Sequence, residues 1–506
     1  MKNRSLWISV GVALVAAAVL AGCGTTSYPD GRTLPPSGLV NRVVIAIQNP
    51  GIVNRGALQI VDAFYDERSG FNGTPPVFSI AGYSGALPAT IQNLPEEQIG
   101  AVYGAGDGSL LLANYASERI TKTVGGIPAP SSSVFITRNQ TYVFAASQTL
   151  HQLTIAAISN GASLGLNLPD VYRISVNPAG TVVLAFVQNS PYVYYPRALT
   201  SEQSISYAGG PSTWPKAAVD CEPQIAPLWC LFQMQSPDAT DATGNYYGAP
   251  LTFDHPIKAV FSSDGGTAYI LSCGPECGGT TAAFTPVPIA PMLFPLSQAS
   301  GLLPTTAALA TATVPIPGGA SNALVTTVNI SGVTTNVLYV VGQCPELASS
   351  FGKCQRTVSN QSLFGGNLTV VNLANNSITN STPISDGTPG AMSRMVEADD
   401  NTLWIAMSGC TTGVRYATNP ASGYGCLTMY DTLHNQVAMI EPYIGNATGV
   451  TAVLGLHKIY TAEGGQVYIY STKDGSSINN QFVVVTGTAY DVAYIDALTD
   501  ADNTVY

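Results

Sequence analysis

Three basic residues stand at the same place in three similar segments of the chain. Arg173, Lys258 and Arg394 each lie at the start of a short apolar stretch that is followed by a tight turn and a second apolar stretch. The chain has 19 Lys and Arg against 30 Asp and Glu, a net charge of −11. If the fold brings these cations together, they could bind an anionic ligand or an acidic segment of a partner. The competing interpretation is an ion pair between each cation and a nearby acid, for which the chain offers Asp170, Asp254 and Glu397.

Cysteines form the second candidate group. After Cys23, eight cysteines remain, in four couples of close neighbours. In an exported chain an even number indicates disulfides, although eight cysteines allow 105 pairings. We expect neighbours to pair because each couple encloses a short loop: Cys221–Cys230, Cys273–Cys277, Cys344–Cys354 and Cys410–Cys426. Metal ligation is the alternative for the CxxxC spacing of Cys273 and Cys277, but no second such pair or His lies close in sequence, so no metal is expected.

Other residues show no catalytic spacing. The four His residues form neither an HxH nor an HExxH pattern, and they are His151, His255, His434 and His457. The chain has no GxSxG elbow, and its Gly-rich stretches lack the Lys of a phosphate-binding loop. We therefore expect no cofactor and favour a non-enzymatic protein. The acidic charge also argues against nucleic-acid binding, which needs a basic surface.

The start of the chain has the layout of a secretory signal. Lys2 and Arg4 precede an apolar stretch of 15 residues, Leu6 to Leu20, which is shorter than the roughly 20 residues that a membrane-spanning helix needs. The stretch ends in Leu20-Ala-Gly-Cys23. This ending resembles the lipobox of bacterial lipoproteins.

The resemblance implies that Cys23 carries the lipid and becomes the mature N-terminus. Residues 1–22 would then be the signal peptide, and 23–40 the lipidated Cys with a flexible linker. The lipid would hold the protein to a membrane of the bacterial cell envelope, and Gly24 after the Cys favours the outer membrane by analogy with enteric bacteria. Loss of Lys2 and Arg4 would take the net charge to −13.

The three basic residues belong to a hairpin unit that recurs along the chain. Clear copies, each with Asp, Asn or Gly in the turn, are 173–187, 258–272 and 394–408. Looser copies are 101–114, 134–146, 324–341 and 450–462. Further strands follow some hairpins, as at 367–373 and 466–471. A hairpin plus two strands, repeated every ~40 to 70 residues, is typical of a β-propeller blade.

In detail the units resemble the YVTN-type repeat of surface-layer-like propellers. The resemblance rests on Asp-Gly turns, second strands such as Leu338-Tyr-Val-Val and third strands such as 426–431. It implies an all-β propeller of four-stranded blades over 41–506. We expect seven blades, with eight as the alternative. Strands at 41–48, 57–65 and 77–82 lack an inner partner, and 491–498 lacks a blade, so we expect them to pair and close the ring.

The expected fold places three cysteine couples on one face of the ring, in loops between second and third strands. Cys221–Cys230 fits this arrangement less well and could join a first and a second strand. Arg173, Lys258 and Arg394 would lie at one mouth of the central channel. The expected function is a binding or scaffold module for an envelope protein or a glycan. The alternative is a propeller hydrolase of the lactonase kind, because the fold hosts many unrelated functions.

Overall fold

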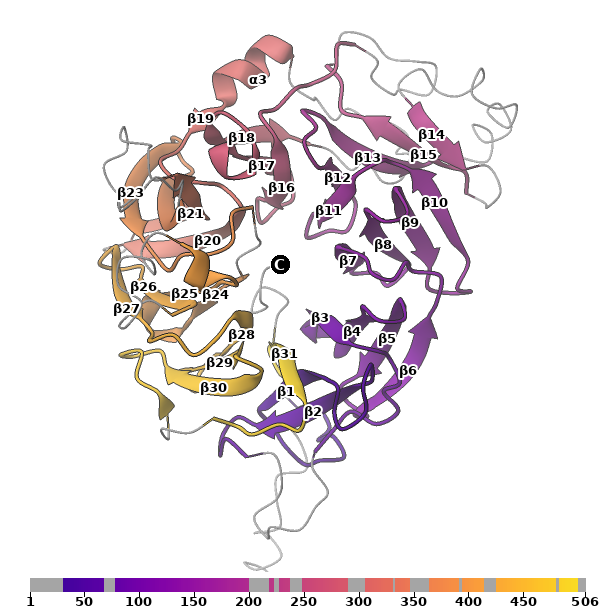
Figure 1. Ribbon diagram of the computed structural model, residues 1–506, viewed down its shortest axis with the longest axis vertical. Helices are drawn as coiled ribbons and strands as arrows, with labels where there is room; N and C mark the ends of the chain where they lie inside the picture. The colour runs from indigo at the N-terminus through magenta and orange to yellow at the C-terminus, as the bar shows by residue number, and fades with distance from the viewer. Residues whose placement is uncertain are drawn as a thin grey trace, which may run out of the picture.

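The strands of this chain pair mainly with their sequence neighbours and build a closed ring. The computed structural model describes residues 31–67, 78–199, 218–222, 227–236, 248–289, 305–330, 333–345, 364–390, 394–413, 425–478 and 482–498. The described strands form eight sheets, which are arranged as blades around a central axis (Figure 1). The inner strand of each blade lies next to the axis. We number the blades along the chain, beginning with the blade that contains the first strand.

The strands of each blade follow in order from the axis outward. Blade 1 contains β31 (Thr488–Tyr494), β1 (Arg42–Gln48) and β2 (Gly56–Asp62). Blade 2 contains β3 (Pro88–Leu94), β4 (Ile99–Gly104), β5 (Ser109–Asn114) and β6 (Arg119–Val124). Blade 3 contains β7 (Ser133–Ile136), β8 (Tyr142–Ser147), β9 (Gln152–Ala157) and β10 (Ser163–Asn167). Blade 4 contains β11 (Val171–Val176), β12 (Val183–Val187), β13 (Val193–Ala198), β15 (Trp229–Gln233) and β14 (Ala218–Glu222).

The second half of the chain follows the same plan. Blade 5 contains β16 (Pro256–Phe261), β17 (Thr267–Cys273), β18 (Ala282–Pro288) and β19 (Val314–Pro315). Blade 6 contains β20 (Asn322–Ile330), β21 (Val333–Pro345), β22 (Phe364–Asn372) and β23 (Ser377–Pro383). Blade 7 contains β24 (Arg394–Ala398), β25 (Thr402–Ala406), β26 (Leu427–Asp431) and β27 (Gln436–Ile440). Blade 8 contains β28 (Ala447–Val453), β29 (Lys458–Glu463) and β30 (Gln466–Ser471).

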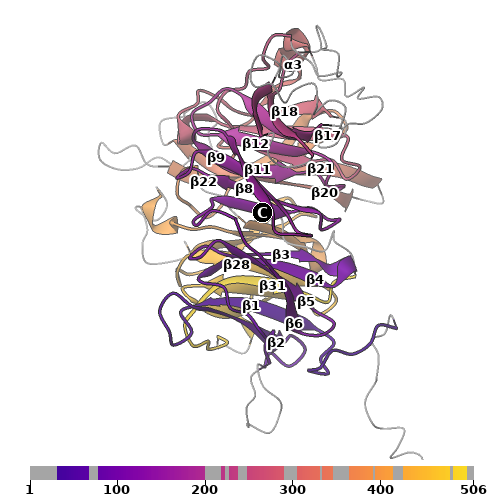
Figure 2. The same cartoon turned by 90° about the vertical axis from the view of Figure 1, so that its right-hand side faces the viewer.

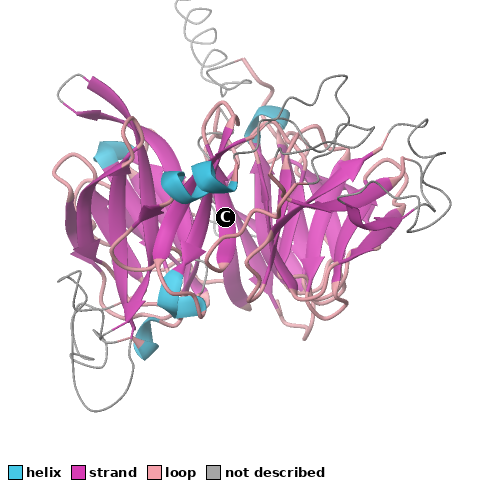
Figure 3. Ribbon diagram, turned by 90° about the horizontal axis from the view of Figure 1, so that it is seen from above, coloured by secondary structure: helices cyan, strands magenta, loops and turns pink. Residues whose placement is uncertain are grey.

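Helices are few and short. The described ones are η1 (Pro95–Glu97), η3 (Gly274–Cys277), α3 (Thr306–Ala312), η5 (Asp399–Asn401) and η6 (Cys410–Thr412). They lie in connections between strands, outside the sheets (Figure 3). In the described part of the chain, no helix has the length and apolar character that crossing a membrane would require.

The apolar core lies between neighbouring blades. A blade is covered on both faces, so its middle strands are apolar on both sides. All five residues of β25 are buried, for example. Its Trp404 contacts Tyr470 of β30 in the next blade, with ring centroids 5.9 Å apart. Such contacts repeat around the ring and hold each inner strand at a fixed distance from the axis.

The blade count of seven is wrong, and the structure has the eight blades of the alternative. Three of the stretches expected to close the ring do so, because β1 pairs with both β2 and β31, whereas the described part of 77–82 forms only isolated bridges such as Gln59 with Ser79. These three strands form a blade of their own rather than completing one of the seven hairpins. The hairpin at 101–114 is also shifted, since it contains the second and third strands of blade 2. Its inner strand β3 was missed because its sequence, PATIQNL, alternates polar and apolar residues too weakly.

Blade 4 carries an insertion. The fourth strand from the axis is β15, and β14 pairs along its outer edge. Cys221 and Cys230 face each other across these two strands and form a disulfide, with Cα atoms 4.0 Å apart. This disulfide therefore joins the two outermost strands of the blade, and not a first and a second strand as expected.

The antiparallel topology gives the ring two distinct faces, seen edge-on in Figure 2. On the rim face, the chain enters each inner strand and turns from the second strand to the third. On the far face, the chain turns from the inner strand to the second and from the third strand to the outermost. The disulfides Cys273–Cys277 and Cys410–Cys426 follow second strands, so both lie on the rim face.

Candidate functional site

The basic residues singled out in the sequence lie on a ring of eight positions around the axis. We define the inner rim as the first residue of each inner strand, or the first after a β-bulge at its start. Bulges occur at the start of β3, β11, β16, β28 and β31, and a bulge re-aims the side chain that follows it. In blade order, the inner rim is Asp491, Thr90, Ser133, Arg173, Lys258, Asn322, Arg394 and Gly449.

The three cations of the inner rim reach across to other blades. Lys258 Nζ lies 2.5 Å from Asn322 Oδ1 in blade 6. Arg173 donates from Nη1 to the carbonyl oxygen of Ser321, 3.3 Å away, which is also in blade 6. Arg394 forms an ion pair with Asp491 of blade 1. Arg173 and Lys258 therefore meet neighbouring residues of blade 6, and Arg394 is close enough to act electrostatically on Lys258, although the three lie up to 221 positions apart in the sequence.

Gly449 makes the ion pair between Arg394 and Asp491 sterically possible. Blade 8 lies between the blades of these two residues, and its rim position is this glycine. A Cβ atom there would lie 2.7 Å from Asp491 Oδ1 and 2.8 Å from Asp491 Cα. Any side chain at this position would displace the carboxylate that the guanidinium needs.

The inner rim is electrostatically unbalanced. It holds three basic residues and one carboxylate, and their surroundings are poor in water, since Asp491 is 0%, Lys258 3% and Arg173 7% exposed. Burial lowers the pKa of Lys258 well below its usual value, and the positive charges of Arg173 and Arg394 lower it further. Burial also lowers the pKa of Arg173 and raises that of Asp491. Each shift reflects the cost of holding charge in this region.

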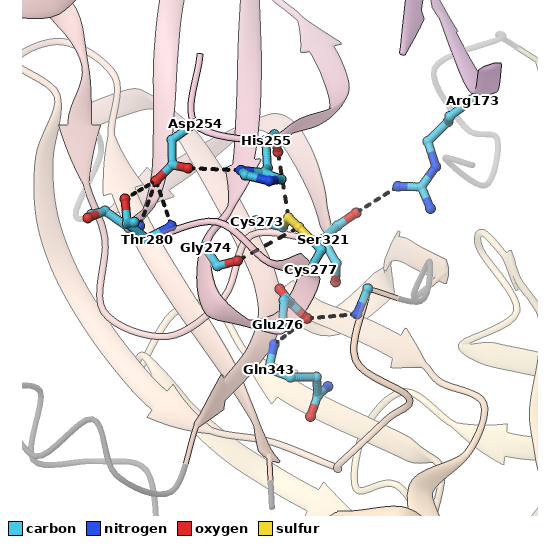
Figure 4. The surroundings of a disulfide bond; sticks show 12 residues. Arg173, Asp254, His255, Cys273, Gly274, Glu276, Cys277, Thr280, Ser321 and Gln343 are labelled. Atoms are coloured by element: carbon cyan, nitrogen blue, oxygen red, sulfur yellow. Dashed lines mark hydrogen bonds and ion pairs between the residues drawn. A yellow bond between two sulfur atoms is a disulfide. The ribbon is translucent and has the colours of Figure 1, made fainter. Parts of the chain in front are cut away.

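Glu276 lies close to this group on the rim face (Figure 4). It belongs to η3, whose ends are joined by the disulfide Cys273–Cys277. Its Oε2 atom accepts hydrogen bonds from the backbone N–H of Gln343 at 3.0 Å and of Gly390 at 3.1 Å. The carboxyl group thus links a loop of blade 5 to blade 6 and to the segment before blade 7.

The carboxyl group of Glu276 carries a proton at neutral pH. Burial raises its pKa to about 8, and the hydrogen bonds and the nearby Arg173 only partly oppose this. The Oε1 atom of Glu276 is buried and has no hydrogen-bond partner among the described residues. A protonated acid therefore lies within electrostatic reach of a rim cation.

A second group of acids lies between blades 7 and 8 on the same face. Glu441 follows β27, and Glu463 ends β29; they are 1% and 0% exposed. The Tyr470 hydroxyl lies 2.8 Å from Glu441 Oε2 and 3.2 Å from Glu463 Oε2. Burial raises the pKa of both carboxyl groups, and the neighbouring Glu441 raises that of Glu463 further. The pair therefore holds a proton that two separate glutamates would have lost at neutral pH.

The acids expected to pair with the three cations are engaged elsewhere. Asp170 lies 3.9 Å from His151. Asp254 accepts backbone hydrogen bonds from Thr280 and Thr281, both at 2.8 Å. Glu397 accepts a hydrogen bond from the Thr326 hydroxyl at 2.5 Å. Arg394 uses Asp491 instead, 97 residues further along the chain.

The cysteine couples are described in part. Disulfides join Cys221 to Cys230, Cys273 to Cys277 and Cys410 to Cys426, with Cα separations of 4.0, 6.0 and 5.3 Å. Cys344 lies in β21, but its expected partner Cys354 lies outside the described residues, as do Cys23 and the signal segment. Within the described ranges, no group of three or more His, Cys, Asp and Glu residues could hold a metal ion.

Comparison with known proteins shows the fold. No family model matches the chain, and no curated protein matches its sequence. A dihydro-heme d1 dehydrogenase, NirN, in complex with DHE is similar over 94% of this chain and 80% of that chain, with 10% identity and a TM-score of 0.51. A periplasmic gluconolactonase of Pseudomonas aeruginosa, PpgL, covers 90% of this chain and 98% of its own, with 11% identity and a TM-score of 0.39. At such identities the likeness shows a β-propeller and leaves the function open.

Proposed function

We propose that this protein is an envelope lipoprotein whose propeller binds a carboxylate-bearing group of a protein or glycan partner at the inner rim. One observation carries the proposal: the rim holds three basic residues and one carboxylate in a chain whose net charge is −11. A bound anion would offset this local excess of positive charge. Charge-assisted hydrogen bonds from a guanidinium to a carboxylate are among the stronger polar contacts in proteins.

Access to the rim is narrow, which favours a slender anionic group over a broad surface. The side chain of Arg394 is 14% exposed, and Arg173, Lys258 and Asp491 are more deeply buried. Little competing water reaches such a site, so each ionic contact is worth more than on an open surface. A single carboxylate extended from a larger partner fits these limits.

The anchor is part of the proposal. The lipobox-like run ending at Cys23 supports lipidation, and Gly24 supports the outer membrane as the destination. The mass of the mature protein purified from bacterial membranes tests this directly. A mass that corresponds to residues 23–506 with lipid on Cys23 is expected, and an unmodified Cys23 would contradict the anchor.

Calorimetric titration with citrate, a small carrier of carboxylate groups, tests the rim. Binding of citrate is expected, and it should weaken about tenfold or more when Lys258 or Arg173 is replaced by Met, since each tenfold change corresponds to about 1.4 kcal/mol. Lys473→Gln, at an exposed basic residue far from the rim, is the matched control and should leave the affinity unchanged. Equal citrate affinity in the wild type and in a variant that lacks all three rim cations would overturn the proposal.

A second candidate function, a hydrolase of the lactonase kind, is favoured by Glu276. A carboxyl group with a pKa of about 8, within electrostatic reach of Arg173, could give a proton to a leaving oxygen while the basic residues stabilise developing negative charge. Hydrolysis of a δ-lactone by the wild type, lost in Glu276→Gln, would support this function. No turnover by the wild type would exclude it for that substrate class and leave the binding proposal standing.

A further inference from the structure

Residues 32–42 make several polar contacts with one face of the ring. Arg42, which opens β1, is fully buried and donates from Nε and Nη2 to Asp496, at 2.9 and 2.6 Å. Its Nη1 atom donates to Glu118 at 2.9 Å. Ser37, earlier in the segment, donates from its backbone N–H to the same Glu118 at 2.8 Å. Arg32 contacts the carbonyl oxygen of Asp496 at 3.4 Å.

These partners identify the face. Asp496 follows the inner strand β31, and Glu118 lies in the turn between the third and outermost strands of blade 2. Both positions belong to the far face. Residues 32–42 therefore lie on the far face, opposite the inner rim and the disulfides of blades 5 and 7.

An apolar patch adjoins this segment on the same face. Phe64 and Tyr65 follow the third strand of blade 1, and Leu498 follows its inner strand. They are 56%, 53% and 65% exposed. The neighbouring Ala63 and Ala497 pack in one core cluster, so the two loops lie together. We call Phe64, Tyr65 and Leu498 the far-face patch.

Lys458 of blade 8 binds the loop that carries the two aromatic rings. Lys458 Nζ lies 2.8 Å from both carboxylate oxygens of Asp66 and 2.9 Å from the carbonyl oxygen of Ala63. Phe64 and Tyr65 contact each other edge to face, with centroids 4.8 Å apart. The ion pair neutralises Asp66, whereas the next residue of the loop, Glu67, is exposed and leaves one acid beside the patch.

We infer that the far-face patch rests on the lipid surface and that the inner rim faces away from the membrane. This inference rests on the proposed lipid anchor. The nine peptide units between Cys23 and Arg32 span at most about 30 Å when fully extended. The inner strands have four to nine residues, and one of seven residues, such as β31, rises roughly 23 Å. An anchor beneath the rim face would therefore need a nearly straight linker around the edge of the blades.

Contact on the far face needs no such extension. Exposed aromatic and leucine side chains are suited to the interface between headgroups and acyl chains, where tyrosine rings are enriched in membrane proteins. The net negative charge of the chain argues against attraction to anionic lipids. The surface that fits is therefore a zwitterionic one, reached through the anchor and apolar contact.

Two matched tryptophan variants test the orientation. Leu498 and Ile52 are equally exposed, at 65%, and lie in the same blade. Leu498 is on the far face, whereas Ile52 is in the turn between β1 and β2, on the rim face. Leu498→Trp and Ile52→Trp proteins are attached to phosphatidylcholine vesicles that contain brominated acyl chains, and the fluorescence of the wild type is subtracted as background.

The anchor in this experiment is artificial, so that its outcome does not depend on native lipidation. A polyhistidine tag replaces the residues before position 23, Cys23 is changed to Ala, and the vesicles contain a nickel-chelating lipid. The expected result is loss of the Leu498→Trp emission and unchanged Ile52→Trp emission. Equal quenching of both variants, quenching of neither, or quenching of Ile52→Trp alone would each overturn the orientation.

The two proposals can fail separately. An unmodified Cys23 in the native protein would remove the anchor, while the vesicle result would still report which face a tether at position 23 presents. A lipidated Cys23 with an overturned vesicle result would leave the lipoprotein in place and reject the far-face contact. Phe64→Trp, in the same patch, should be quenched together with Leu498→Trp.

Discussion

The buried carboxyl pair between blades 7 and 8 should make the ring less stable as the pH rises. Glu463 and Glu441 together keep a proton in the native state, because burial raises the pKa of both and the neighbouring Glu441 raises that of Glu463 further. In the unfolded chain both would titrate near their usual value of 4.5. Between that value and the raised native pKa, the native state binds more protons than the unfolded state.

The sign follows from this difference in bound protons. A group whose pKa is raised on folding contributes its full stability below its unfolded pKa and loses it as the pH rises towards the folded value. For one extra proton the loss is about 1.4 kcal/mol per pH unit. From about pH 5 to about pH 8 the pair therefore lowers the free energy of unfolding by about 4 kcal/mol. This is a large part of the ~5 to 15 kcal/mol that stabilises an ordinary protein.

Glu463→Gln isolates this effect. An amide of the same shape stays neutral at every pH and can still donate to Glu441. The free energy of unfolding, measured by denaturant titration from about pH 5 to about pH 8, should fall less steeply in the variant than in the wild type, by about 1.4 kcal/mol per unit. The two proteins should be nearly equal at the acid end, and the variant should be the more stable one at the alkaline end.

Controls separate the pair from the other buried acids. Glu276, whose pKa burial raises to about 8, contributes to the slope of both proteins and cancels in the comparison. Glu97→Gln, at an exposed residue of η1, should not alter the slope. Parallel stability curves for the wild type and Glu463→Gln would refute the reasoning, and Glu441→Gln provides a second variant if the first fails to fold.

Two further substitutions test the contacts that close the ring. Gly449→Ala should lower the free energy of unfolding by about 1–3 kcal/mol because its Cβ would meet Asp491. Gly125→Ala, where a Cβ would have nothing within 4 Å, should have little effect. Equal effects of the two substitutions would contradict the steric argument. Arg42→Met should lower the free energy of unfolding by about 3–5 kcal/mol because it leaves buried carboxylates without their cation. Arg119→Met, at an exposed residue, should leave it unchanged. Equal losses in both variants, measured by thermal or denaturant unfolding, would show that the contacts of Arg42 do not stabilise the closed ring.

The fold could be predicted from local patterns, and the count of blades could not. Turn residues and apolar strands repeat within about 15 residues, and such signals specify hairpins well. The closing blade is assembled from both ends of the chain, with β1 paired to β31 more than 400 positions away. No local pattern distinguishes strands that complete another blade from strands that form one.

The candidate site shows the same division. Arg173, Lys258 and Arg394 could be found because each has the same place in a repeated unit. Asp491 and Gly449 have no such signal, since their importance comes from meeting across a neighbouring blade. Register shifts at the start of five inner strands decide which residues form the rim, and a single shift moves a side chain to the other side of its strand.

The direction of ring closure links the rim to the proposed anchor. β1 is antiparallel to the inner strand β31, so β1 begins where β31 ends. Since every inner strand begins at the rim face, the segment before β1 must approach on the far face, whatever its sequence. If the chain began with the inner strand of a blade, the same segment would arrive at the rim and crowd the cations. Closure through a second strand therefore leaves the inner rim clear of the linker, and it is the topology, more than any one residue, that separates the two faces.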